Sequence, residues 1–93
     1  MSWLKIAHKQ FLALSSGEQA KILAKVNCLT STDGNLDIKK LKGYKDLFRL
    51  RCGEHRVVFS VDKNVKHLSI AVIGHRKNVY DFLKAFGVLF FAS

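Results

Sequence analysis

The sequence has no proline, two cysteines and six glycines among its 93 residues. The lack of proline and the scarcity of glycine exclude collagen-like, proline-rich and flexible-linker architectures. Two cysteines are too few for a disulfide-dense secreted scaffold. Acidic residues are also scarce, because seven Asp and Glu stand against 16 Lys and Arg. The resulting net charge of +9 indicates that the partner is a polyanion or an acidic protein.

The chain is long enough for one hydrophobic core, since a second core would need roughly 50 further residues. With 48% hydrophobic residues the chain is too apolar to remain disordered, so we expect one domain over residues 1–93. The apolar run Phe82–Phe91 is interrupted by Lys84 and is shorter than the roughly 20 residues that cross a membrane. Residues 1–13 show no secretory pattern. We therefore expect a cytoplasmic protein with no membrane partner.

The positive charge is concentrated in the second half of the chain. The segment Lys39–Lys77 holds eleven Lys and Arg and three Asp and Glu, which is +8 of the total +9. Basic residues also keep small domains soluble, but solubility does not require them all in one segment. We therefore favour a binding surface for an anionic partner in this half.

The N-terminal half has the pattern of a helical hairpin. Residues 2–7 alternate loosely and predict a short strand, and residues 9–14 predict one or two helical turns. A serine at position 15 or 16 is suited to an N-cap, and an amphipathic helix of about three to four turns follows it. The apolar residues at helical spacing are Ala20, Ile22, Leu23, Val26 and Leu29. The pair Asp33-Gly34 predicts a turn before the basic half.

The second half predicts a sheet. Three runs rich in β-forming residues, Leu47–Cys52, Arg56–Val61 and His67–Ile73, predict three strands. Gly53-Glu54 between the first two runs predicts a two-residue type II′ hairpin turn. Helical spacing then returns at Val79, Phe82, Leu83 and Phe86. We predict an α+β fold with an N-terminal helical hairpin on one face of a small antiparallel sheet and a short C-terminal helix.

The predicted hairpin brings three arginines to one face. If Gly53-Glu54 is the turn, Arg51 lies opposite Arg56 and Arg49 shares their face. The other face is apolar, with Phe48, Leu50, Val57 and Phe59. Like charges in opposed positions destabilise a sheet, and a phosphate that bridges the two guanidinium groups would offset this cost. The alternative is that the arginines extend into water or pair with Glu54 and Asp62.

A second group of polar residues follows the third predicted strand. Gly74-His75-Arg76 and Val79-Tyr80 add an arginine, an imidazole and a phenol. Guanidinium groups and an aromatic ring are what the recognition of RNA phosphates and unpaired bases requires. The structural alternative is that Tyr80 covers the core and His75 is an ordinary surface residue.

Other chemistry has little support in the sequence. Cys52, His55 and His75 do not have a zinc-binding spacing, and no Gly-rich phosphate loop is present. We therefore predict neither a metal site nor a cofactor. Cys28 and Cys52 are interpreted as core residues rather than nucleophiles.

Several short motifs together resemble the RelE/ParE superfamily of bacterial toxins, over almost the whole chain. The motifs are Leu41-Lys42-Gly43, Phe48-Arg49-Leu50-Arg51 with Gly53, Arg56-Val57-Val58-Phe59, and Gly74-His75-Arg76 with Val79-Tyr80. The RelE-like branch is the more similar. The resemblance implies the toxin of a type II toxin–antitoxin system, held in a hetero-oligomer by a cognate acidic antitoxin. That antitoxin would lie against the face that carries the three arginines, or it would displace the short C-terminal helix.

RelE-like members cut messenger RNA in the ribosomal decoding site, so the resemblance implies an endoribonuclease that inhibits translation. Cleavage would be metal-independent, by attack of the ribose 2′-hydroxyl on the adjacent phosphate. Arg51 and Arg56 would stabilise the pentacoordinate phosphorus, Arg76 would serve the leaving 5′-oxygen, and Tyr80 would orient a base. Further RNA contacts are assigned to Arg49, Lys42, Lys45 and Lys77.

One position departs from the RelE pattern, which has Lys-x-Lys where this chain has Arg49 and Arg51. Arginine is a poor base because its guanidinium group stays protonated. Arg51 is therefore expected to hold phosphate, while His75 or ribosomal RNA accepts the 2′-hydroxyl proton. Two alternatives are a ParE-like, non-enzymatic inhibitor of DNA gyrase and a degenerate, inactive toxin. The apolar segment Gly87–Phe91 motivates the second.

Overall fold

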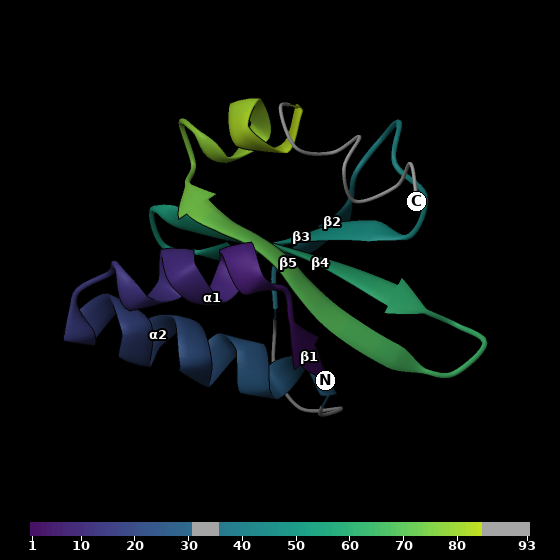
Figure 1. Cartoon of the computed structure of the whole chain (residues 1–93), viewed down its shortest axis with the longest axis horizontal. Helices are drawn as coiled ribbons and strands as arrows, with labels where there is room; N and C mark the ends of the chain where they lie inside the picture. The colour runs from purple at the N-terminus through teal and green to yellow at the C-terminus, as the bar shows by residue number, and fades with distance from the viewer. Residues whose placement is uncertain (31–35, 85–93) are drawn as a thin grey trace.

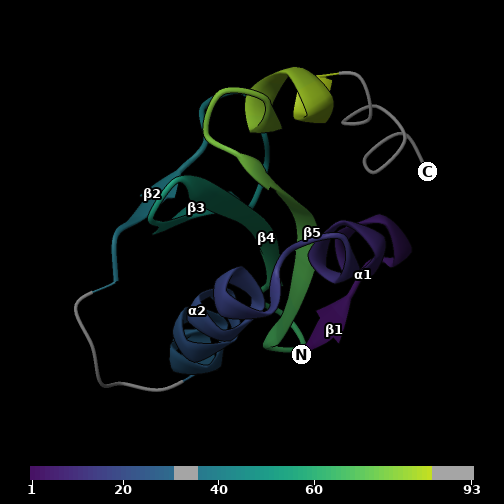
Figure 2. The ribbon, with the colours of Figure 1, turned by 90° about the vertical axis from the view of Figure 1, so that its left-hand side faces the viewer.

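The computed structural model describes residues 1–30 and 36–84, and it has the predicted α+β fold (Figure 1). Two helices lie on one side of a five-stranded sheet of order β1-β5-β4-β3-β2, and the helical residues 79–84 lie on the other side (Figure 2). The elements are β1 (Ser2–Trp3), α1 (Lys5–Leu12), α2 (Ser16–Asn27), the 3-10 turn η1 (Cys28–Thr30), β2 (Ile38–Lys40), β3 (Leu47–Cys52), β4 (His55–Asp62) and β5 (His67–His75).

The start of the chain differs from the prediction. Strand β1 has two residues, and α1 begins at Lys5 rather than near position 9. Leu4 causes the change, because its N–H donates to the carbonyl of Ile70 at 2.8 Å while its own carbonyl accepts from the N–H of His8 at 3.1 Å. The same residue therefore ends the strand and starts the helix, which the alternation of residues 2–7 does not reveal.

Helix α2 was predicted at its observed position, but its buried face is narrower than expected. The Ser15 hydroxyl accepts from the Glu18 N–H at 3.3 Å and caps the helix. Ile22 and Val26 are buried, whereas Ala20 is exposed and Leu23 is 40% exposed. The predicted turn at Asp33-Gly34 lies outside the described residues.

The β3–β4 hairpin has the predicted register, with Arg51 opposite Arg56 and Phe48 opposite Phe59. Gly53 has a φ of +59°, as the first central position of a type II′ turn requires. Each residue therefore points to its predicted face. Because a one-residue slip would exchange the two faces, this turn fixes where the arginines lie.

The sheet differs from the prediction at both edges. Strand β1 pairs with β5 in parallel, with Ser2 opposite Ser69, so the sheet is antiparallel only from β5 to β2. At the other edge Ile38–Lys40 forms strand β2, which the sequence analysis missed. All three residues of β2 are exposed, so the segment lacks the apolar alternation that marks a half-buried strand.

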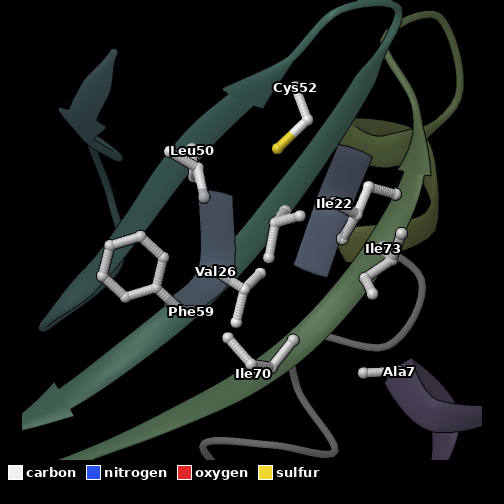
Figure 3. Close-up of a cluster of buried hydrophobic side chains, with 9 residues drawn as sticks. Ala7, Ile22, Val26, Leu50, Cys52, Phe59, Ile70 and Ile73 are labelled. Carbon is white, nitrogen blue, oxygen red and sulfur yellow. The ribbon is translucent and has the colours of Figure 1, made fainter. Parts of the chain in front are cut away.

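Each face of the sheet has its own apolar cluster. Between the sheet and the helices α1 and α2, the cluster consists of Ala7, Ile22, Val26, Leu50, Cys52, Val57, Phe59, Ile70 and Ile73 (Figure 3). Under the closing helix lie Leu47, Val58, Ala71, Val72, Val79 and Leu83, with Phe82 against them. The predicted packing of the closing helix is thus confirmed for Val79 and Leu83, whereas Phe86 and Gly87–Phe91 lie outside the described residues. Within residues 1–30 and 36–84, no helix is long and apolar enough to cross a membrane.

Candidate functional site

The three hairpin arginines share one sheet face, as predicted. Strands β2, β3 and β4 form two cross-strand rows, in which Lys39 is next to Arg49 and Arg51 is next to Arg56. Leu50 and Val57, which belong to the opposite face, are fully buried beneath the helices. The alternation of the two strands therefore separates a basic surface from the helix-covered core.

Arg56 is more enclosed than predicted. The residue is 9% exposed, and its Nη1 donates to the carbonyl of Gly53 at 2.8 Å and to that of His55 at 3.0 Å. These bonds tie the guanidinium group to its own hairpin turn. The side chain of Arg51, directly opposite, is 54% exposed. The two opposed cations thus avoid each other, because one folds back onto the turn and the other extends into solvent.

An anion does lie between two of the arginines, and it belongs to the protein. The Asp37 carboxylate places Oδ1 3.3 Å from Nη2 of Arg49 and Oδ2 3.8 Å from Nη1 of Arg51. Glu54 and Asp62 were predicted as alternative partners of the arginines, and Asp37 was not. Asp37 directly precedes β2, so this pairing could be found only by recognising that strand.

Arg76 is held at the same end of the sheet by Glu54. The backbone N–H of Arg76 donates to the Glu54 carbonyl at 2.8 Å, and its Nε lies 3.1 Å from Oε2 of the same residue. Glu54 is the second residue of the hairpin turn to which Arg56 is bonded. The fold thus brings Arg51, Arg56 and Arg76 together around one turn, although Arg76 is distant from the others in the sequence.

The predicted base-stacking residue lies on the helix that covers this face. Tyr80 is 40% exposed, and Val79 beside it is buried. Gly74 is the cross-strand neighbour of Arg56, and a Cβ at Gly74 would lie 3.4 Å from the Cβ of Val79. The missing side chain lets the helical residues 79–84 approach the sheet closely. Tyr80 is therefore carried by a segment anchored beside Arg56.

His75 does not lie on the sheet face that carries Arg49, Arg51 and Arg56, which we call the arginine face. Its cross-strand neighbour is His55, whose ring is 5.9 Å away and nearly perpendicular, and this row belongs to the helix-covered face. Nε2 of His75 is 3.7 Å from Oε2 of Glu54, and Nδ1 accepts the N–H of Lys77 at 3.2 Å. A neutral ring that accepts at Nδ1 carries its proton on Nε2. In this arrangement His75 has no ring nitrogen available to accept a proton.

The predicted RNA-contacting lysines divide into two groups. Lys77 is exposed in the turn directly after Arg76. Lys42 and Lys45 are exposed in the β2–β3 connection, at the opposite end of β3 from Gly53. A six-residue strand spans about 20 Å, so Lys42 and Lys45 lie well away from the arginines at the Gly53-Glu54 turn.

Neither cysteine has the environment of a nucleophile. Cys52 is 7% exposed in the core, as predicted, and this burial raises the pKa of its thiol, although Lys25 and Arg56 act in the opposite direction. Cys28, which was also predicted to be a core residue, is only half-buried. Within the part of the chain that the structure describes, no group of three or more His, Cys, Asp or Glu is placed to hold a metal ion.

The fold and the site together define a class of protein, namely small basic α+β domains with arginines gathered at one hairpin turn. No family model matches the chain. Toxin RelE3 of Methanocaldococcus jannaschii is 36% identical over 56 residues, which are 60% of this chain and 61% of that relative. The match thus spans less than two thirds of the relative's length.

Solved structures of the same kind match over a larger share of the chain. The RelB-RelE antitoxin-toxin complex from Methanococcus jannaschii matches with a TM-score of 0.71 and 28% identity, over 88% of this chain and 98% of the other. The archaeal RelE-RelB complex from Pyrococcus horikoshii OT3 matches with a TM-score of 0.68 and 26% identity, over 81% and 91%. The chain is therefore similar in sequence and in fold to RelE toxins.

Proposed function

We propose that the protein is the toxin of a toxin–antitoxin pair and cleaves messenger RNA on the ribosome. The observation that carries this proposal is the convergence of Arg51, Arg56 and Arg76 on the Gly53-Glu54 turn, with Tyr80 exposed on the helix that packs against Gly74. Guanidinium groups bind phosphate through paired N–H donors, and an exposed ring can stack on an unpaired base. The similarity to RelE toxins in complexes with RelB supports the assignment to a toxin.

The proposed reaction is an internal transfer at phosphorus. The ribose 2′-oxygen forms a bond to the adjacent phosphorus, the bond from phosphorus to the 5′-oxygen breaks, and a 2′,3′-cyclic phosphate results. Arg51 is exposed and reaches the phosphate, whereas Arg56 has Nη1 bonded to carbonyls and turns Nη2 and Nε to it. Arg76 neutralises charge on the leaving oxygen, and Tyr80 positions the base. No metal or cofactor takes part.

The proton of the 2′-hydroxyl needs an acceptor. His75 can serve only after its Nδ1 releases the N–H of Lys77 and its ring turns toward the arginine face, because that bond occupies the lone pair and the register places the ring on the opposite face. Without that release, a group of the ribosomal RNA accepts the proton. Arg49, Lys42, Lys45 and Lys77 contribute phosphate contacts that hold the RNA along β3.

The proposed protein partner is inferred from the net charge of the chain. A chain of net charge +9 favours an acidic antitoxin, which would cover the arginine face or displace the helical residues 79–84 that carry Tyr80. The toxin would act in the cytoplasm as a single domain and be stored there as a toxin–antitoxin hetero-oligomer.

The proposal is tested on translating ribosomes by mapping the 5′ ends of cleaved messenger RNA. We expect cleavage by the wild type and a rate about 10²-fold lower for Arg76→Ala, by analogy with the loss of one oxyanion-hole donor. Tyr80→Phe should retain stacking and most of the activity, whereas Tyr80→Ala should not. Lys9→Ala, which removes one exposed positive charge from α1, is the matched control.

Two results would contradict the ribonuclease. The first is an Arg76→Ala variant that cleaves RNA and arrests growth as the wild type does. The second is the absence of cleavage together with inhibition of gyrase supercoiling, which would assign the chain to the ParE-like function instead.

A further inference from the structure

The carboxylate of Asp37 lies where an anionic ligand of the arginine face would be expected. It faces Nη2 of Arg49 at 3.3 Å and Nη1 of Arg51 at 3.8 Å, and its side chain is 52% exposed. A carboxylate and a phosphodiester use the same donors of a guanidinium group. Asp37 and an RNA phosphate therefore cannot both occupy this position.

The backbone fixes Asp37 at this place. The N–H of Arg51 donates to the carbonyl of Asp37 at 3.0 Å, and the next residue, Ile38, pairs with Leu50. The β2–β3 pairing thus extends to Asp37. Because its side chain is short and its backbone is fixed, the carboxylate lies near the two arginines when no ligand is bound and can move only a short way when a ligand displaces it.

The ion pairs themselves are weak. Both distances exceed the roughly 2.7–2.9 Å of strong charge-assisted bonds, and half-exposed carboxylates are well solvated. A phosphate that is also contacted by Arg56 or Arg76 can therefore displace Asp37. The side chain of Arg49 is only 14% exposed, so the pairing also keeps this guanidinium group directed toward Asp37.

We propose that Asp37 is an internal competitor for phosphate, which lowers the affinity of the arginine face for RNA and is displaced when RNA binds. The identity of the ligand rests on the proposed function, but the competition itself does not. Asp37 then acts as a specificity-determining residue, because an RNA that engages only Arg49 and Arg51 must first replace the carboxylate. RNA whose phosphates also contact Arg56 or Arg76 displaces the carboxylate more easily.

The experiment measures binding of a single-stranded RNA decamer with 2′-O-methyl riboses, which cannot be cleaved, by fluorescence anisotropy over a range of salt concentrations. We expect Asp37→Asn to bind roughly threefold more tightly at low salt. The slope of log K against log salt should steepen by about 0.7 if one more phosphate is neutralised. Asp62→Asn, at the far end of β4, changes the net charge equally and should have a smaller effect.

A double-mutant cycle tests whether the effect of Asp37→Asn on RNA affinity depends on Arg49 and Arg51. In an Arg49→Ala, Arg51→Ala background, Asp37→Asn should no longer change the affinity, because the competed donors are absent. Unchanged or weaker binding by Asp37→Asn in the wild-type background would overturn the proposal, since a residue that orients the arginines would weaken binding when removed. Asp37→Ser is the second variant, and urea unfolding checks that both are folded.

A second probe separates failure of this inference from failure of the proposed function. Inorganic pyrophosphate is titrated into the same variants by isothermal calorimetry. If the wild type binds pyrophosphate but not the free decamer, the competition can still be measured with pyrophosphate, while cleavage on translating ribosomes decides the ribonuclease proposal separately. Tighter pyrophosphate binding by Asp37→Asn supports Asp37 as the competitor, and equal or weaker binding refutes it.

Discussion

The two faces of the β3–β4 hairpin are built from alternating residues of the same strands, yet they have opposite properties. Leu50 and Val57 are opposite each other and fully buried, whereas Arg51 and Arg56, one position closer to the turn on each strand, face the other side. One face supplies apolar area to the core and the other supplies charge. Because one face of these strands is buried in the core, the backbone positions of the charged residues on the other face are fixed as well.

The arginine face is itself divided. Near Leu47 and Val58 it is apolar and covered by the closing helix, and near the Gly53-Glu54 turn it is basic. Arg56 stands at the boundary, because its guanidinium group is largely enclosed and hydrogen-bonded to the turn. We therefore expect Arg56 to contribute to stability as well as to chemistry, unlike Arg51.

The largest effect on stability is expected from the buried face. Leu50→Ala should lower the free energy of unfolding by about 2–5 kcal/mol, because it removes a fully buried side chain and leaves a cavity. Arg51→Ala, the next position on the exposed face, should change it by no more than about 0.5 kcal/mol. Urea unfolding followed by circular dichroism measures both. Equal losses for the two variants would contradict the division between the faces.

Arg56→Ala should have the second largest effect, a loss of about 1–3 kcal/mol. The carbonyls of Gly53 and His55 would lose the guanidinium donor in a largely buried place. Both carbonyls accept from Nη1 alone, so Arg56→Lys, which keeps the charge and several N–H donors but changes the shape of the side chain, should cause an intermediate loss. The same unfolding assay checks this order, and an Arg56→Ala variant as stable as Arg51→Ala would show that the two bonds do not hold the turn.

The hairpin and its faces could be predicted because they depend on local information. A two-residue turn at Gly53-Glu54 fixes the register, and the register fixes which residues share a face. Counting residues outward from this turn places Arg51 opposite Arg56. The parallel pairing of β1 with β5 could not be found in this way, since β5 is distant in the sequence. Strand β2 was missed because it has no buried residue.

The candidate site could be predicted only in part. The arginines were placed on the correct face, but Asp37 was missed because its position depends on β2. The enclosure of Arg56 depends on how a long side chain folds, and alternation does not determine that. His75 was grouped with the arginines because it is adjacent to Arg76, although its register turns it to the opposite face. At the end of a strand, residues that are adjacent in the sequence can point to opposite faces of the sheet.

Gly53→Ala tests the turn that separates the two faces. The φ of +59° costs a residue with a Cβ about 1–2 kcal/mol, and no atom lies within 4 Å of the place that the Cβ would take, so the cost is conformational alone. Gly17→Ala in α2 is the matched control, because Gly17 also has open space around it. The control should be neutral or slightly stabilising, since alanine restricts the unfolded chain. Equal unfolding energies for the two variants would mean that the turn tolerates a side chain.

The smallest expected effect concerns the buried face and appears only at alkaline pH. Burial raises the pKa of the Cys52 thiol in the folded protein, so above the pKa of the unfolded chain, about 8.5, the unfolded state loses its proton first. The folded state then holds more protons, and the free energy of unfolding falls as the pH rises. The loss should be under about 1 kcal/mol at pH 9.

Cys52→Ala isolates this contribution, because the variant retains Cys28 and every other titrating group. The difference in unfolding energy between wild type and variant should be constant from about pH 6 to pH 7.5, where the thiol is protonated in both states, and should fall above that range. Urea unfolding at a series of pH values measures the difference. A difference that stays constant up to pH 9 would show that Cys52 titrates alike in the folded and unfolded chains. The buried face of the hairpin would then be open to water at the end where Cys52 lies beside the arginine-bearing turn.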